Sequence, residues 1–252
     1  MSMNTDQSSS SRSPLLVLVH GFLDNRTAWS PLVDALALSG YACTAMDLKG
    51  AGALQASPGP FTLDQAVEDV VNHIGADERP VVLIGHSMGA QIAELAAARL
   101  ASAVSALVLL TPTPLEGNTL PDEVRSLLRE SGGDAGAQQG IRRAFSRNLS
   151  EAQIQSATAE DVLMGKEAVR GYYDAFTGGD VAGENPTACA GPVLLLGAEN
   201  DPVIAPEMVR RIQQDRFPAA RLEFVANSGH WLQLEQTEAT ARAISDFLRS
   251  LQ

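Results

Sequence analysis

Short apolar segments alternate with longer amphipathic segments along most of the chain. There are six short segments, and several of them are apolar at consecutive positions, which is the pattern of strands buried on both faces of a parallel sheet. These segments cover residues 15–20, 41–47, 80–85, 106–111, 192–197 and 222–225. Because helical segments lie between them, the pattern predicts an α/β fold with a doubly wound, mostly parallel sheet of about six strands.

The amphipathic segments have the spacing of helices. Those expected to pack on the sheet cover residues 29–39, 63–74, 88–100, 206–216 and 238–251. One connection, residues 112–190, is far too long for a simple crossover and contains no convincing strand. Helical spacing within it covers residues 121–130, 137–147, 151–164 and 166–176. An insertion of this length is not expected to be structureless. We expect it to form a helical cap over the carboxyl ends of the strands, where open α/β sheets bind ligands.

The chain therefore divides into a core, residues 14–111 and 191–252, and a helical lid, residues 112–190. The first segment, residues 1–13, is polar and serine-rich and lacks the apolar stretch of a signal peptide. It is predicted to be a disordered tail, and the protein is expected to be cytoplasmic.

Composition and charge exclude several classes of function. No apolar run reaches the ~18 residues that a membrane-spanning helix needs. The formal net charge of −12 opposes general binding to nucleic acid, whose phosphates require basic surfaces.

The two cysteines, Cys43 and Cys189, have neither disulfide nor metal-site spacing and are expected to be reduced and buried. Neither a phosphate-binding loop nor a dinucleotide fingerprint is present, so no cofactor or metal is expected. The sequence leaves the oligomeric state open.

The pentapeptide Gly85-His86-Ser87-Met88-Gly89 follows a predicted strand and opens a helix rich in alanine and leucine. This context is that of a nucleophile elbow, a tight strand-to-helix turn that raises a serine hydroxyl above the sheet. Small residues are needed beside the serine because the chain approaches itself closely there. The helix N-terminus offers free N–H groups to a developing oxyanion. Ser87 is therefore the candidate nucleophile.

A serine hydroxyl needs a general base to become a good nucleophile. Among the four histidines, His230 follows the last predicted strand, and the loops after parallel strands meet at one edge of the sheet. His230 is therefore the candidate base for Ser87. The other histidines fit less well: His73 falls within a helix, His86 occupies the variable position of the elbow, and His20 is expected to shape its own loop by hydrogen bonding.

The base in turn needs a carboxylate that holds its tautomer and stabilises the imidazolium. The loop after the fifth predicted strand carries Asp201, with Glu199 two residues earlier as the alternative. The order Ser87, Asp201, His230 is the order of nucleophile, acid and base expected for this architecture.

Two backbone N–H groups are candidates for an oxyanion hole. Met88 directly follows the nucleophile. Phe22 follows Gly21 in the loop after the first strand, where a glycine lets the backbone approach closely.

Together these motifs resemble those of the α/β-hydrolase superfamily over roughly residues 14–251. The matching residues are His20-Gly21-Phe22, Gly85 to Gly89, Asp201 with Pro202, and Gly229-His230-Trp231. The resemblance implies that residues 112–190 form a cap domain that shapes the substrate pocket. It also implies the compact sheet of the esterase and hydroxynitrile-lyase branch.

The resemblance implies an enzyme, and individual residues narrow the reaction. Ser87 argues against haloalkane dehalogenases and epoxide hydrolases, relatives whose nucleophile is aspartate. Trp231 stands where a hydroxynitrile lyase would carry lysine. The expected activity is hydrolysis of a small-to-medium, fairly apolar carboxylic ester or lactone through an acyl-enzyme. A C–C bond hydrolase and a synthase of the menaquinone-pathway type use the same triad and remain alternatives. A non-catalytic ligand-binding member of the fold is a further alternative, although such proteins often lose a triad residue.

Apolar side chains near these motifs are candidates for the substrate pocket. Leu23 and Trp231 flank the candidate oxyanion loop and base. From the lid, Leu163, Met164, Tyr172, Tyr173 and Phe176 are expected to close the pocket. The same lid residues also suit the packed core of the lid helices.

Overall fold

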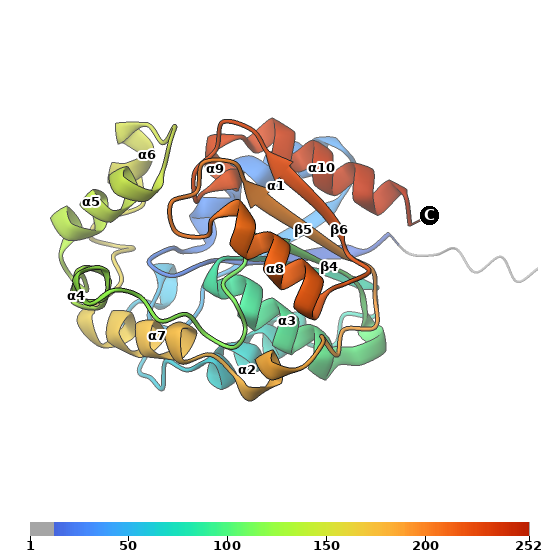
Figure 1. Cartoon of the computed structure of the whole chain (residues 1–252), viewed down its shortest axis with the longest axis horizontal. Coiled ribbons are helices and arrows are strands. Elements are labelled where there is room, and N and C mark those ends of the chain that lie inside the picture. The colour runs from blue at the N-terminus through green and yellow to red at the C-terminus, as the bar shows by residue number, and fades with distance from the viewer. Residues whose placement is uncertain (1–12, 252) are drawn as a thin grey trace, which may run out of the picture.

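Six parallel strands form one sheet at the centre of the molecule, in the order β2-β1-β3-β4-β5-β6 (Figure 1). The computed structural model describes residues 13–251, so residues 1–12 of the predicted tail lie outside the described part. The strands are β1 (Leu15–Val19), β2 (Ala42–Met46), β3 (Val81–His86), β4 (Val104–Leu110), β5 (Val193–Ala198) and β6 (Arg221–Val225). The predicted α/β fold is confirmed, and each strand lies within two residues of its predicted bounds.

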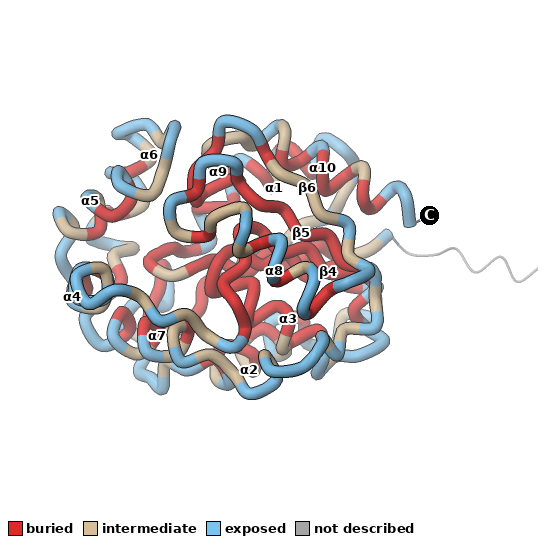
Figure 2. The backbone as a smooth tube through the Cα atoms, viewed as in Figure 1, coloured by how far each residue is buried: buried red, intermediate tan, exposed pale blue. Residues whose placement is uncertain are grey.

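Helices cover both faces of the sheet, which explains why the strands are apolar at consecutive positions. Leu16 and Leu18 pack into a cluster with α1 and α10, whereas Val17 and Val19 face the opposite cluster with α2, α3 and α8. The helices of the core are α1 (Ser30–Leu38), α2 (Leu63–Ile74), α3 (Met88–Leu100), α8 (Pro206–Arg216), α10 (Thr237–Arg249) and the short α9 (Leu232–Glu235), which precedes α10. Figure 2 shows that burial concentrates in the central strands, and β1, β3 and β5 are buried throughout.

The segment between β4 and β5, residues 112–190, is called the cap segment below. It contains α4 (Asp122–Arg129), α5 (Ala135–Phe145), α6 (Glu151–Ser156) and α7 (Lys166–Gly178), which gather at one end of the molecule (Figure 1). Short 3-10 helices η1 (Arg26–Trp29), η2 (Gly52–Leu54), η3 (Ala101–Ala103) and η4 (Val181–Glu184), together with α9, were not predicted.

One predicted helix is wrong in length. The sequence predicted helix over residues 151–164, but α6 ends at Ser156. The Thr158 hydroxyl donates to the Ile154 carbonyl (3.0 Å) and so competes with continuation of the helix. The chain then turns before Gly165, the N-cap of α7.

The two cysteines are free, as expected, but they are half-buried rather than fully buried. Cys43 lies on β2, an edge strand whose residues are mostly half-exposed. Burial nevertheless raises the pKa of the Cys43 thiol to about 11.

Among residues 13–251, no helix has both the length and the apolar character needed to span a bilayer.

Candidate active site

Ser87 occupies the turn between β3 and α3 in a conformation that non-glycine residues rarely adopt, with φ 54° and ψ −118°. The glycines on either side make this turn possible. A Cβ on Gly85 would lie 2.2 Å from the Gly89 carbonyl oxygen, and a Cβ on Gly89 would lie 2.3 Å from the Val19 oxygen. The elbow therefore packs against itself and against β1, and it requires residues without side chains at both positions.

Three side chains from separate loops meet at the carboxyl ends of the strands. His230 Nε2 lies 3.0 Å from Ser87 Oγ, and His230 Nδ1 lies 2.7 Å from Asp201 Oδ2. Asp201 is held by the N–H groups of Val203 and Ile204, which donate to its Oδ1 at 2.7 and 3.0 Å. All three residues are less than a tenth exposed.

Of the two carboxylates proposed from sequence, the structure brings only Asp201 to the imidazole. Glu199 is exposed, and among residues 13–251 the carboxylate that pairs with His230 Nδ1 is that of Asp201. In the neutral imidazole, a bond from Nδ1–H to the Asp201 carboxylate leaves Nε2 without a proton and able to accept that of the Ser87 hydroxyl.

The environment of His230 stabilises the imidazolium form of the ring more than water does, and so raises its pKa. Burial alone would lower the pKa of His230, but the charge and hydrogen bond of Asp201 raise it, and the charges of Asp24 and Glu235 add to this. The net effect is a pKa above its ordinary value. Such a ring holds a proton well once it has taken one from a nucleophile.

The two candidate oxyanion donors adjoin the nucleophile. Met88 is the first residue of α3, so its N–H has no partner within the helix. A Cβ built on Gly21 would lie 3.2 Å from the Ser87 Cβ, so the loop that carries Phe22 packs directly on the elbow. In the described part of the chain, neither N–H donates to another backbone carbonyl.

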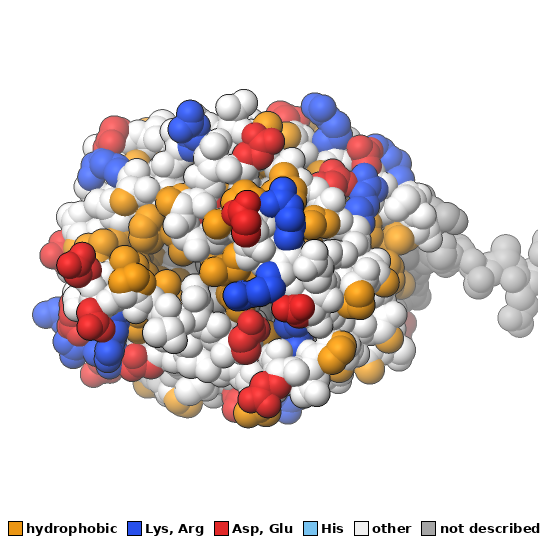
Figure 3. Space-filling model, in the orientation of Figure 1, with side chains coloured by type: hydrophobic (Ala, Val, Ile, Leu, Met, Phe, Trp, Pro, Cys, Tyr) orange, Lys and Arg blue, Asp and Glu red, His pale blue; other side chains and the backbone are white. Residues whose placement is uncertain are grey.

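Ser87 and His230 open onto a narrow cavity of about 40 Å³ between the core and the cap segment. Its walls are mostly apolar, and they include Phe22, Leu23, Ile141, Phe145, Phe176 and Trp231. The Thr113 hydroxyl also reaches this space, 3.4 Å from Ser87 Oγ. Hydrophobic side chains gather on the same side of the molecule, over the cap segment, in Figure 3.

Of the predicted pocket residues, Leu23, Trp231 and Phe176 line the cavity, but four do not: Leu163, Met164, Tyr172 and Tyr173. The Tyr172 hydroxyl donates to the Lys49 carbonyl (2.9 Å), away from the cavity. The Tyr173 ring packs behind Phe22 and Phe176, with centroids 6.3 and 5.4 Å away.

The remaining two lie away from the cavity as well. Met164 is buried inside the cap segment, where its carbonyl accepts the Gln138 side-chain amide (3.1 Å). Leu163 is half-buried in the turn before α7. Helical spacing does not distinguish the wall of a pocket from the core behind it, so the sequence pattern alone could not separate these four residues from those that line the cavity.

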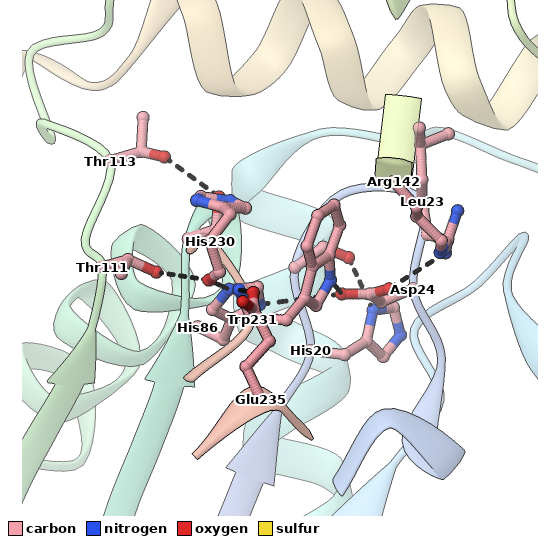
Figure 4. Close-up of polar contacts among 12 residues, drawn as sticks. His20, Leu23, Asp24, His86, Thr111, Thr113, Arg142, His230, Trp231 and Glu235 are labelled. Carbon is pink, nitrogen blue, oxygen red and sulfur yellow. Dashed lines mark hydrogen bonds and ion pairs between the residues drawn. The ribbon is translucent and has the colours of Figure 1, made fainter. Parts of the chain in front are cut away.

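The other histidines do not contact Ser87 through their rings. His20 Nδ1 donates to the Gly21 carbonyl (2.9 Å) and its Nε2 accepts the Leu48 N–H (3.0 Å), so His20 shapes its loop as expected. His86 Nε2 donates to the His230 carbonyl oxygen at 2.8 Å (Figure 4). It thereby supports residues 226–231, the loop between β6 and α9 that is called the histidine loop below.

A buried charged cluster beside the site carried no signal in the sequence. Asp24 accepts the Trp231 indole N–H (2.9 Å) and the Arg142 guanidinium (3.0 Å), as Figure 4 shows. Arg142 comes from α5 and also donates to the Leu23 carbonyl. Both charged side chains are no more than 2% exposed. The cluster therefore ties the cap segment to the loop that carries Phe22 and to the residue after His230.

Asp24 is a carboxylate at neutral pH despite its burial. Burial alone would raise the pKa of Asp24, but His86, the Arg142 charge and the Trp231 N–H together hold it below its ordinary value. Removing Arg142 would therefore leave a buried negative charge without its main counter-ion.

We expect Arg142→Met to lower the free energy of unfolding by about 3–5 kcal/mol, the usual cost of breaking a buried ion pair from one side. Urea unfolding followed by circular dichroism measures this change. The neighbouring Arg143 pairs with Glu151 at the surface, so Arg143→Met is the matched control and should change stability little. Equal unfolding midpoints for the two variants would contradict the role given to the Asp24–Arg142 pair.

In the described residues, no group of three or more histidine, cysteine, aspartate or glutamate side chains is arranged to hold a metal ion. The polar groups around Ser87 are instead those of a hydroxyl, an imidazole and a carboxylate in series.

Comparisons with known proteins agree with the fold. Epoxide hydrolase 3 of Xenopus tropicalis is 25% identical over 275 aligned positions, covering 94% of this chain and 72% of that protein. The esterase EaEST from Exiguobacterium antarcticum superposes with a TM-score of 0.82 at 21% identity, covering 94% of this chain and 92% of that one. The enol-lactonase from Burkholderia xenovorans LB400 superposes with a TM-score of 0.78 at 22% identity, again covering 94% and 92%. At these identities the two structures show a shared fold alone.

The sequence itself carries the family pattern over nearly its whole length. The model of the alpha/beta hydrolase family matches residues 16–243, from β1 into α10. The elbow, the parallel sheet and the loops that follow its strands all lie within that match, and the chain belongs to the alpha/beta hydrolase family.

Proposed function

We propose that this protein is a serine hydrolase that cleaves a small-to-medium carboxylic ester or lactone through an acyl-enzyme. The observation that carries the proposal is the series of two contacts, Ser87 Oγ to His230 Nε2 (3.0 Å) and His230 Nδ1 to Asp201 Oδ2 (2.7 Å). This series ends at an apolar cavity, where an uncharged acyl group would lie beside the hydroxyl.

In the first half-reaction, Ser87 Oγ attacks the carbonyl carbon while its proton passes to His230 Nε2. The N–H groups of Phe22 and Met88 donate to the oxygen that becomes negative. The C–O bond to the leaving group breaks, and His230 returns its proton to the departing alcohol oxygen. The acyl group is then bound to Ser87.

In the second half-reaction, water takes the place of the alcohol. His230 accepts a proton from water, whose oxygen attacks the acyl carbon. When the bond to Ser87 Oγ breaks, the imidazolium returns its proton to the serine. The carboxylic acid leaves and the resting enzyme is restored. For a lactone, the alcohol and the acid remain parts of one molecule.

The cavity supports a compact, apolar substrate. Its volume of about 40 Å³ is well below the roughly 300–1,000 Å³ of pockets that hold drug-sized ligands. Hydrolysis of p-nitrophenyl esters of increasing chain length, and of simple lactones, tests this. We expect the shortest esters to react fastest. Turnover of a C–C bond substrate with none of the esters or lactones would replace the proposal with the alternative reaction on the same triad.

The pH dependence follows from the environment of His230. The free base is the active form, so kcat/KM should rise with pH and level off once the imidazole is neutral. Because the pKa of His230 is raised, the midpoint of this rise should lie above the ordinary value of about 6.5. Initial rates between about pH 5 and 9 measure it, and a flat profile from about pH 5 to 8 would contradict the role of His230 as base.

A further inference from the structure

The carboxylate of Glu235 accepts four backbone N–H groups. Two belong to the residues on either side of His230: Gly229 donates to Oε2 at 2.9 Å and Trp231 donates to Oε1 at 3.1 Å. The other two belong to the cap segment just after α5, where Arg147 and Asn148 donate to Oε2 at 2.7 and 3.0 Å. One side chain of α9 therefore joins the histidine loop to the cap segment (Figure 4 shows Glu235 below His230).

The histidine loop has little space in which to shift while these bonds hold. The His230 N–H itself donates to the Phe145 carbonyl, the last residue of α5, at 3.0 Å. A Cβ on Gly229 would lie 2.8 Å from both the Arg147 nitrogen and the Phe145 oxygen. The backbone that carries the imidazole is thus held between Glu235 and the end of α5.

We propose that Glu235 is a positioning residue, which holds His230 in hydrogen-bonding range of Ser87 by joining its loop to the cap segment. The inference rests on the proposed function, because it concerns the alignment of the proposed base. Glu235 does not touch the cavity, so it acts only through His230.

A carboxylate suits this position better than an amide. All four partners are N–H donors, and a carboxylate offers two oxygens as acceptors. Glutamine has one oxygen and an NH2 group, which is a donor. If the glutamine oxygen kept the three bonds now made to Oε2, its NH2 group would face the Trp231 N–H. The hydrogen bond from Trp231 would then be lost, whereas that from Gly229 would remain. Glu235→Gln therefore changes the loop that bears the base while barely changing volume.

The charge of Glu235 also acts on the imidazole. Four titratable groups face His230 from the elements around it: Asp201 after β5, Asp24 after β1, His86 at the end of β3, and Glu235 in α9. Burial lowers the pKa of His230, whereas Asp201, Asp24 and Glu235 raise it. Neutralising Glu235 should therefore move the acid limb of any His230-dependent rate to lower pH.

The rate at which a fluorophosphonate probe labels Ser87, measured between about pH 5 and 9, tests the proposal without an ester substrate. We expect Glu235→Gln to lower the plateau rate about 10- to 100-fold, the effect of displacing a reacting group by a fraction of an ångström to an ångström. The midpoint of the pH profile of labelling should lie at lower pH in Glu235→Gln than in the wild type. Glu238→Gln, which removes an exposed glutamate three residues away, should change neither value. Melting temperatures are recorded for each variant.

The outcomes are distinguishable. If the wild-type protein is not labelled at Ser87, the proposed function itself fails. If the wild type is labelled and folded Glu235→Gln reacts at the same rate, the positioning role is overturned. A slower rate with an unmoved pH midpoint and a lowered melting temperature would also overturn it, because it would show a structural role alone.

Glu235→Asp is the second variant and decides the matter if Glu235→Gln does not fold. Aspartate keeps the charge but is one methylene shorter, so it cannot reach both sides of His230 as Glu235 does. We expect a midpoint close to that of the wild type and a plateau rate between those of the wild type and Glu235→Gln. A wild-type plateau rate for Glu235→Asp would overturn the proposal.

Discussion

Replacing Ser87 with alanine is expected to lower kcat for ester hydrolysis by roughly 10⁶-fold, because no acyl-enzyme can form without the hydroxyl. Ser87 lines the cavity, and in the described part of the chain its hydroxyl forms side-chain hydrogen bonds with His230 and Thr113 alone. Alanine can take up the same backbone conformation about as well as serine. The variant should therefore fold normally, and initial rates with a p-nitrophenyl ester together with its melting temperature measure both effects.

Ser126→Ala is the matched control, since Ser126 is an exposed serine on α4. This variant should retain wild-type rates. A fluorophosphonate probe should label the wild type and the control but not Ser87→Ala. Hydrolysis by Ser87→Ala at more than a trace of the wild-type rate would mean that another group is the nucleophile.

The second large effect is expected at Asp201. Asp201→Asn should lower kcat by roughly 10⁴-fold, because it selects the wrong tautomer of His230. Two N–H groups, from Val203 and Ile204, already donate to Oδ1. The asparagine oxygen should take that position, which turns its NH2 group toward His230 Nδ1. Nδ1 then becomes an acceptor, and Nε2 carries a proton toward Ser87 and cannot accept another.

Glu199→Gln is the control for this variant. Glu199 lies in the same loop, has the same formal charge and is exposed. We expect its replacement to leave kcat nearly unchanged. A fully active Asp201→Asn enzyme together with an inactive Glu199→Gln enzyme would transfer the role of the acid to Glu199.

Several elements could be predicted closely because their signals are local. The helices α2, α3 and α8 begin and end at the predicted residues. Thr62 caps the first through the Gln65 N–H, and Pro206 occupies the first turn of the third. The helix predicted at α6 was too long. The hydrogen bond from the Thr158 hydroxyl near the end of α6 does not alter the spacing of hydrophobic residues, so the spacing could not predict where the helix ends.

The sequence by itself determined that Ser87, Asp201 and His230 follow strands of a parallel sheet, and chain direction then brings their loops to one edge. It did not determine which carboxylate reaches the imidazole or which cap residues face the cavity. Tertiary structure alone decided the contacts of Asp24 with Arg142, which are 118 residues apart, and of Glu235 with residues 147 and 148. Such pairs depend on how the cap segment packs against the core. Hydrophobic periodicity identifies the buried face of one helix or strand at a time, so it cannot predict which polar side chains of two different elements will pair.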